Sequence, residues 1–325
     1  RASPATDLVN LLASAVMQTR HLAGALEARD PERLARALGI HMVHTAGGWY
    51  DPERTQRIGE RVEELLRGDP APQTVAEIAL ARAGAAWMEG RLPACLADAD
   101  HAMSLLRRSS CVGMQWHIDT HHVMELEVLE AMGRWDDVAA RLGPYVQDAR
   151  ERGDLFLEAS LRVRFRPTLL LAADAPGEAR DEIASARRAW NQSAFDLVAL
   201  YGSLREAWCD LYAGDVERAK ATMDAAWKET QRSLLVRIVF YRDMVAAARA
   251  TALAAWARAT AEGKARTRAV REVRAIAKGL RATGSPVPRA QARMLDAAIA
   301  AIEGRLDAAA AYADAAASFD ALGAA

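Results

Sequence analysis

Apolar residues recur at helical spacing through most of the chain. Leu197, Leu200, Tyr201 and Leu204 occupy positions i, i+3, i+4 and i+7, and the pattern resumes after Gly214. This period places an apolar stripe on one side of an α-helix and leaves the other side polar. No segment reads convincingly as a strand, so the pattern predicts an all-α protein of roughly fourteen helices.

A short turn motif interrupts the helical pattern about every 42 residues. Clear copies stand at 88–92 (Met-Glu-Gly-Arg-Leu), 131–135 (Ala-Met-Gly-Arg-Trp), 212–216 (Tyr-Ala-Gly-Asp-Val) and 302–306 (Ile-Glu-Gly-Arg-Leu), and weaker ones near residues 48, 174 and 263. Each marker glycine is expected to take a positive φ and end a helix. One hairpin cannot bury its apolar side alone, but a row of hairpins can. We therefore expect residues 1–325 to form one α-solenoid domain of about seven antiparallel hairpins.

Other local signals agree with this register. Small or modest residues, which let two helices approach closely, stand five positions past five of the markers: Cys95, Val138, Ala179, Ala219 and Ala309. The marker at Gly263 differs from this pattern, because the residue five positions after it is the large Arg268. Asp-Pro pairs at 30–31, 51–52 and 69–70 predict helix starts with an aspartate cap. Pro167 predicts a kink or an interruption in its helix.

Four further stretches of sequence carry a family signal. They are Arg-Gly-Asp-Leu at 152–155, Leu-Leu-Ala-Ala-Asp at 170–174 with Glu-Ala-Arg at 178–180, Asp-Leu-Tyr-Ala-Gly-Asp at 210–215, and Ser-Leu-Leu-Val-Arg at 233–237. The hairpins resemble tetratricopeptide repeats, and these stretches resemble the C-terminal repeat region of large bacterial serine/threonine protein kinases and related signalling ATPases. The resemblance extends over residues 40–325 and implies an interaction or regulatory module. Because the chain begins at Arg1, we expect a piece of a larger protein.

Composition narrows the functions open to such a module. The net charge is −1, which gives no overall field for nucleic acid or a membrane surface. No apolar run is long enough to span a membrane and no secretory pattern opens the chain, so we expect a cytoplasmic protein without membrane contact. Cys95, Cys111 and Cys209 are interpreted as small buried residues, and the tryptophans mostly as packing residues.

The sequence offers little catalytic chemistry. It lacks the glycine-rich loop, the His-Arg-Asp loop and the Asp-Phe-Gly motif of a kinase, and it has no Gly-x-Ser-x-Gly. We therefore predict no enzyme activity, no catalytic residue and no cofactor. His117 and His121 have the one-turn spacing of two metal ligands, but no third ligand is placed. A polar helix face, with the histidines solvated or capping backbone groups, is therefore favoured over a metal site. His41 and His44 repeat this argument more weakly.

A basic stretch offers a second kind of site. Residues 216–290 contain 16 Lys and Arg against 6 Asp and Glu. Four of these cations can share one helix face: Lys264, Arg268, Arg271 and Lys278. They could contact phosphates, but no aromatic residue lies between Trp256 and Tyr312 to stack on bases. A solvated face or a dock for an acidic partner is favoured, and binding of a small molecule or nucleic acid is the alternative.

The leading prediction is a protein-interaction scaffold whose partner lies on the concave side, lined by the first helix of each hairpin. Five residues on three successive helices are candidates for partner contact: Arg162, Arg166, Tyr201, Arg205 and Arg237. Such an arginine ladder suits an acidic peptide, a partner domain or another domain of the parent protein. The alternative is that the arginines pair within the fold with Glu158, Glu206 and Asp243.

Overall fold

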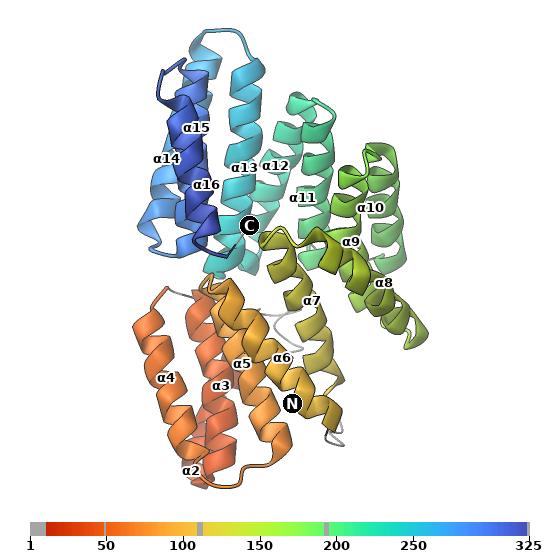
Figure 1. The fold of residues 1–325 in the computed structure, drawn as a ribbon, viewed down its shortest axis with the longest axis vertical. Coiled ribbons are helices and arrows are strands. Elements are labelled where there is room, and N and C mark those ends of the chain that lie inside the picture. Colours follow the sequence, from red (N-terminus) through yellow and green to blue (C-terminus); the bar gives the residue numbers. More distant parts are fainter. Residues whose placement is uncertain (1–10, 49, 109–112, 192–194, 324–325) are drawn as a thin grey trace. The chain divides into compact units, whose positions relative to one another are not determined.

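The computed structural model of the protein describes residues 11–48, 50–108, 113–191 and 195–323. These residues form fifteen α-helices, labelled from α2, and one 3₁₀ helix, and no strand occurs among them (Figure 1). The predicted all-α fold of helices packed against their sequence neighbours is confirmed. The chain divides into two compact units, Arg1–Val128 with Arg237–Phe240, and Leu129–Val236 with Tyr241–Ala325.

The first unit contains five complete helices and most of a sixth. They are α2 (Leu11–Ala28), α3 (Pro31–Gly48), α4 (Pro52–Leu65), α5 (Pro72–Met88), α6 (Leu92–Arg108) and α7 (Gln115–Ala131). Helix α3 packs against α2, α4 and α5, and α5 packs against α6. Trp87 near the end of α5 also contacts Phe240, with ring centroids 4.4 Å apart.

The second unit begins within the last turn of α7 and contains the later helices, apart from Arg237–Phe240 at the junction of η1 and α13. Its helices are α8 (Trp135–Glu151), α9 (Leu155–Ala172), α10 (Pro176–Trp190), α11 (Leu197–Tyr212), α12 (Val216–Arg232), η1 (Leu234–Arg237), α13 (Val239–Ala259), α14 (Lys264–Ala282), α15 (Pro286–Ile302) and α16 (Ala308–Asp320). Helix α9 packs against α8, α10 and α11, and α11 packs against α10 and α12. The hairpin of α9 and α10 therefore contacts the following helix, α11, as in a helical repeat.

The recurring turn motif ends helices in the same way each time. Gly214 has φ +78°, and the peptide N–H of Asp215 donates to the carbonyl of Asp210 at 2.8 Å. This bond closes a Schellman turn, which satisfies a carbonyl at the helix end. The same bond five residues back recurs after the markers Gly90, Gly133, Asp174 and Gly304. The repeat read from the sequence is therefore a repeat of backbone geometry, and Asp174 adopts the left-handed conformation without being a glycine (φ +57°).

The small residues that follow the turns mostly lie between helices. Cys95, Val138, Ala179 and Ala219 are all buried, as predicted. Ala309 is exposed, and α16 instead buries Ala315. After Gly263 the buried residue is Ala269, one position later than the repeat predicts, so Arg268 points to solvent.

Two of the three predicted Asp-Pro helix starts are confirmed. Asp51 accepts a hydrogen bond from the peptide N–H of Arg54 at the start of α4, and Asp30 does the same for α3. The third is wrong, because α5 begins at Pro72 rather than Pro70. Its first turn is instead held by Glu32 of α3, which accepts from the peptide N–H of Ala71 and the hydroxyl of Thr74.

Prolines inside helices do not end them. Helix α9 continues from Leu155 to Ala172 through Pro167, so the predicted interruption does not occur. Pro167 is buried and α8 likewise continues through Pro144. The packing of α9 against three other helices outweighs the one backbone hydrogen bond that a proline removes.

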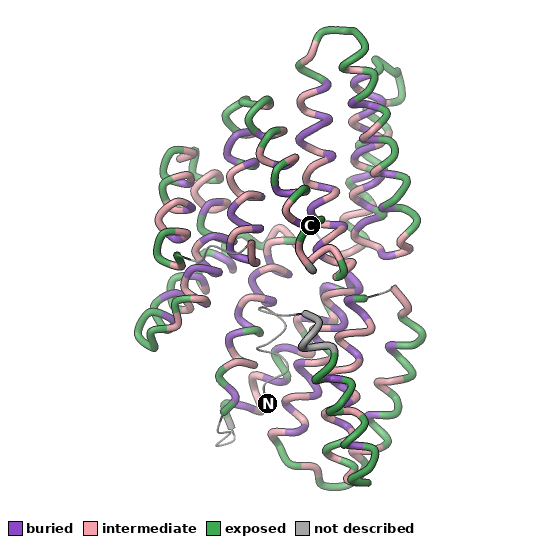
Figure 2. Tube along the Cα trace, turned by 180° about the vertical axis from the view of Figure 1, so that it is seen from behind, coloured by how far each residue is buried: buried purple, intermediate pink, exposed green. Residues whose placement is uncertain are grey.

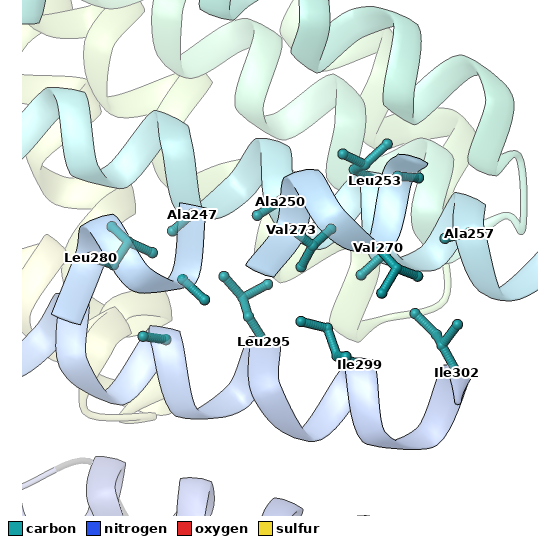
Figure 3. Packing of buried hydrophobic residues seen from close by; sticks show 14 residues of the cluster. Ala247, Ala250, Leu253, Ala257, Val270, Val273, Leu280, Leu295, Ile299 and Ile302 are labelled. Carbon is teal, nitrogen blue, oxygen red and sulfur yellow. The ribbon is translucent and has the colours of Figure 1, made fainter. Parts of the chain in front are cut away.

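The core is a series of apolar layers between neighbouring helices. Figure 2 shows buried residues along one side of most helices, with exposed residues at turns and outer faces. In the last layer, Val270, Val273 and Leu280 of α14 point toward Leu295 and Ile299 of α15 (Figure 3). Among the described residues no helix is both long and apolar enough to cross a membrane.

Candidate partner-binding surface

Arg162 joins α9 to α10. Its guanidinium donates to both carboxylate oxygens of Glu182, at 2.7 and 3.1 Å, and to the hydroxyl of Ser185 at 3.0 Å. Glu158, one turn earlier on α9, accepts a further bond at 3.4 Å. The hydrogen bond to Glu182 raises the pKa of Arg162, and the side chain is mostly buried. This fork-to-fork pairing fixes the guanidinium in place.

The same network continues to both sides of Arg162. Arg150 of α8 donates to Glu158 at 2.8 Å. Arg166, the next candidate along α9, lies 4.0 Å from Glu182 and keeps 54% of its side chain exposed. Three arginines therefore share two carboxylates across α8, α9 and α10, and Arg150 and Arg166 are equally open to solvent, whereas Arg162 is mostly buried.

Arg205 of α11 is held by a separate network. It donates to Glu130, in the last turn of α7, at 2.6 Å. The other oxygen of Glu130 accepts from the hydroxyl of Thr168 on α9 at 3.0 Å. The side chains of Arg205 and Glu130 are only 13% and 15% exposed. Glu130 thus connects three helices that are up to 75 residues apart in sequence.

Tyr201 lies one turn before Arg205 and is buried. The guanidinium carbon of Arg164, on α9, lies 3.9 Å from the centroid of its ring. This cation–π contact is another link between α9 and α11. The phenol ring is therefore covered within the fold.

The predicted residues of α9 and α11 belong to separate networks rather than to one ladder. Arg162 engages α10, whereas Arg164 and Thr168, which meet α11 and α7, lie on the opposite side of α9 by helical geometry. Arg237 is exposed, but it ends η1 and does not lie on the first helix of a hairpin. The other four residues lie on α9 and α11, as predicted, so only the placement of Arg237 on a first helix is wrong. The role of the five residues in partner contact stays a prediction.

The sequence also offered the alternative that these arginines pair with Glu158, Glu206 and Asp243. This is correct for Glu158, whereas the other two carboxylates pair with different arginines. Glu158 pairs with Arg162, but Glu206 pairs with Arg187 of α10 at 2.6 Å, and Asp243 pairs with its neighbour Arg242 at 2.8 Å. Gly202 makes room for the Arg187 guanidinium, since a Cβ at this position would collide with Nε of Arg187. This glycine was a signal in the sequence for close approach of a side chain, and it was missed.

Sequence reasoning also missed two exposed aromatic residues beside Arg205. Trp208 and Tyr212 follow it on α11 at i+3 and i+7, and they are 39% and 51% exposed. The Tyr212 hydroxyl donates to Asp174 at 2.8 Å, and this bond raises the pKa of Tyr212. The interpretation of Trp208 as a packing residue is wrong, and so is that of Trp135, which is equally exposed. We call Arg205, Trp208 and Tyr212 the α11 stripe.

The histidines of α7 occupy a different environment from the predicted one. His121 and His122 are buried, together with Asp119 and Glu125, and His117 is half-buried, so the predicted pair of His117 and His121 does not form a solvated face. The nearest Glu125 oxygen lies 3.9 Å from Nε2 of His121. Among the described residues no three His, Cys, Asp or Glu side chains are grouped as a metal site requires. Burial lowers the pKa of His44, on α3.

The cysteines agree with their interpretation where the structure describes them. Cys95 and Cys209 are free and buried, and burial raises the pKa of Cys95 to about 12. Cys111 lies outside the described residues. Thiols with raised pKa values are poor nucleophiles at neutral pH.

Comparison with protein-family models found no match, and comparison with curated proteins found none either. The fold itself defines the class, which is a helical-repeat protein built from antiparallel hairpins.

Proposed function

We propose that this chain is a non-catalytic protein-interaction module and that the α11 stripe is its main partner surface. The observation that carries the proposal is the exposure of Trp208 and Tyr212 next to the anchored Arg205. Trp, Tyr and Arg are the residues that dominate binding energy at protein interfaces. Helical repeats commonly present such surfaces on successive hairpins.

The rigidity of the stripe supports this role. Arg205 is held by Glu130, and Tyr212 by Asp174, so both side chains have given up rotamer freedom before a partner arrives. Ordering a flexible side chain costs about 0.5–1.5 kcal/mol on binding, and a preorganised side chain avoids part of that cost. A partner that places apolar side chains on Trp208 would bury surface beside side chains that lose little further conformational entropy on binding.

Because Arg162 and Arg205 are already paired with carboxylates, a strongly acidic peptide is no longer the partner expected at this surface. An acidic peptide that reached Arg162 or Arg205 would have to displace Glu182 or Glu130. The α11 stripe therefore suits a segment with apolar anchors and hydrogen-bond acceptors better than a strongly acidic one. Of the five residues predicted from sequence, Arg166 and Arg237 remain accessible for carboxylates.

The biological setting is proposed from the sequence resemblance alone. The stretches that resemble the C-terminal repeats of bacterial serine/threonine kinases and signalling ATPases favour a cytoplasmic signalling protein. In it, this module would bind a peptide, a partner protein or another domain of its parent. The alternative, a ligand-sensing repeat that binds a small molecule or nucleic acid through residues 216–290, is supported by the exposed cations of α14. Its test is affinity for a labelled duplex and single strand at physiological salt.

A capture experiment with matched baits tests the interaction surface. Wild-type protein, the double variant W208A/Y212A and the control L155A are used to recover proteins from an extract of the source cells. Leu155 is also exposed, but it lies about 20 Å along α9 from Thr168, so the control removes apolar surface away from the stripe. We expect W208A/Y212A to lose a partner that L155A retains. Equal recovery by all three baits would refute the α11 stripe as the partner surface.

A further inference from the structure

Helix α14 presents an exposed face that is almost purely cationic. The helix carries seven Lys and Arg side chains and one acid, Glu272. Four of the cations share the face opposite the buried stripe and are all exposed: Lys264, Arg268, Arg271 and Lys278. We call these four the α14 cationic face. They extend over about 21 Å of helix, at 1.5 Å of rise per residue.

The arginines on the other faces of α14 are bonded within the fold. Arg274 pairs with Glu303 at 2.7 Å, Arg281 bonds Asp296, and Arg266 bonds the carbonyl of Ile302, all three linking α14 to α15. Glu272 is taken by Arg249 of α13 at 2.7 Å. Within the described part of the chain, no carboxylate lies within ion-pair distance of the α14 cationic face.

The stability of α14 does not account for this arrangement. Lys264 is the first residue of the helix, the N-cap Gly263 has no side chain to cap it, and the first turn contains no acid. Positive charge at a helix N-terminus opposes the helix dipole. The cations nearest that end are therefore unfavourable for the helix itself and are better explained by something they bind.

Small residues occupy the rest of the same face. Ala275, Gly279 and Ala282 are exposed, and no atom lies within 4 Å of the position of a Cβ on Gly279. A glycine in an exposed helix position weakens the helix relative to alanine. Small side chains between cations allow the backbone of a second helix to come close, with the long cationic side chains reaching around it.

We propose that the α14 cationic face docks an acidic α-helix of a partner protein, with carboxylates at about i, i+4 and i+7 facing Arg268, Arg271 and Lys278. The positive charge of this face favours an anionic partner. The small residues favour a helix over a nucleic acid, because a second helix must bring its backbone close to α14, whereas phosphates need only the cations. No aromatic residue on α14 offers a platform for bases. The inference rests on the proposed role as an interaction module, but it uses a surface separate from the α11 stripe.

The test measures binding of defined probes to the full chain by fluorescence anisotropy. The probes are a helical peptide with Glu at i, i+4 and i+7 in each heptad, the same peptide with Gln in place of Glu, and single-stranded and duplex DNA oligonucleotides. The variants are R268E/R271E on the face and R188E/K228E as the matched control, because Arg188 and Lys228 are exposed cations on α10 and α12. A third variant, A275Q/G279Q, fills the small positions without changing charge.

We expect the Glu peptide to bind and the Gln peptide not to bind. R268E/R271E should weaken the Glu peptide about tenfold or more, because opposite charges become like charges, while R188E/K228E has little effect. A275Q/G279Q should weaken it about fivefold by blocking close approach, and glutamine in place of glycine keeps α14 helical.

Three results would overturn the proposal. They are no binding of the Glu peptide at low salt, an equal loss in R188E/K228E, and DNA binding as tight as the Glu peptide that A275Q/G279Q leaves unchanged. None of these results bears on the capture of a partner through Trp208 and Tyr212, so failure of this proposal and failure of the α11 stripe are distinguishable.

Discussion

The arginines of α9 and α11 and the cations of α14 are the same kinds of side chain in opposite surroundings. Arg162 and Arg205 each donate to a carboxylate of another helix at 2.6–2.7 Å and are mostly buried. Arg268 and Arg271 are exposed, and no carboxylate of the described chain pairs with them. The first set fastens hairpins to one another, whereas the second set is left facing outward.

This difference shows that the position of the carboxylates decides what an arginine does. A cation whose partner lies on the neighbouring helix contributes to stability, and its charge is already paired before a ligand arrives. A cation without such a partner contributes little to stability and keeps its charge for a partner molecule. Charge reversal therefore separates the two sets, because it should lower the free energy of unfolding clearly in the first set and hardly at all in the second.

The largest effect is expected for removal of Glu130. Replacing Glu130 by Ala leaves the mostly buried Arg205 without its carboxylate and Thr168 without its acceptor. Loss of one member of such a pair should lower the free energy of unfolding by about 3 kcal/mol. Urea denaturation measures this loss, with Arg166→Ala as the control at an exposed arginine. A loss no larger than that of the control would show that the pair is not structural.

A smaller effect is expected at Asp224 of α12, and it should depend on pH. Burial by itself raises the pKa of Asp224, but hydrogen bonds from Lys220 and Arg249 outweigh it and hold the pKa below the ordinary value of 3.8. A lowered carboxyl pKa gives stability that is present above pH 3.8 and is lost as the pH falls through the folded-state pKa.

Asp224→Asn should therefore cost about 1 kcal/mol at pH 7, allowing for the partial exposure of the side chain. The difference from wild type should persist at pH 5 and shrink below pH 3.8. Denaturation at several pH values measures it. A difference that stays constant down to pH 2 would contradict the assignment of the charge of Asp224 to this network.

The smallest effect is expected at the start of α14 and has the opposite sign. Lys264→Glu places a negative charge at the first position of a helix whose first turn has no acid. The helix dipole should then stabilise the protein by about 0.3–1 kcal/mol. Thermal melting measures this gain, and Lys278→Glu, which lies far from that end, is the matched control. A lower melting temperature for Lys264→Glu would mean that Lys264 has a structural role.

The sequence was sufficient for the architecture because turns repeat locally. Gly90, Gly133, Gly214 and Gly304 each end a helix with the same backbone bond, and that bond needs only residues within one turn. The exceptions are also local. After Gly263 the buried position moves by one residue, to Ala269, because the turn there differs from the others.

The candidate site was less accessible to sequence reasoning because it depends on contacts between distant residues. Glu130 and Arg205 are 75 positions apart, so no pattern along one helix could pair them. The exposure of Trp208 could not be read from its apolar stripe, since it shares that stripe with the buried Leu197 and Tyr201 and differs from them in lying near the C-terminal end of α11. The cations of α14 were predictable because a helix with seven cations and one acid has too few internal partners.

The most direct test of this account compares the unfolding free energies of Arg162→Glu and Arg268→Glu in urea. Both substitutions change the net charge equally, but only Arg162 faces Glu182 and Glu158. The account predicts a loss of about 3 kcal/mol for Arg162→Glu and a change of no more than about 0.5 kcal/mol for Arg268→Glu. Equal losses in the two variants would contradict the division between fastening arginines and outward-facing cations.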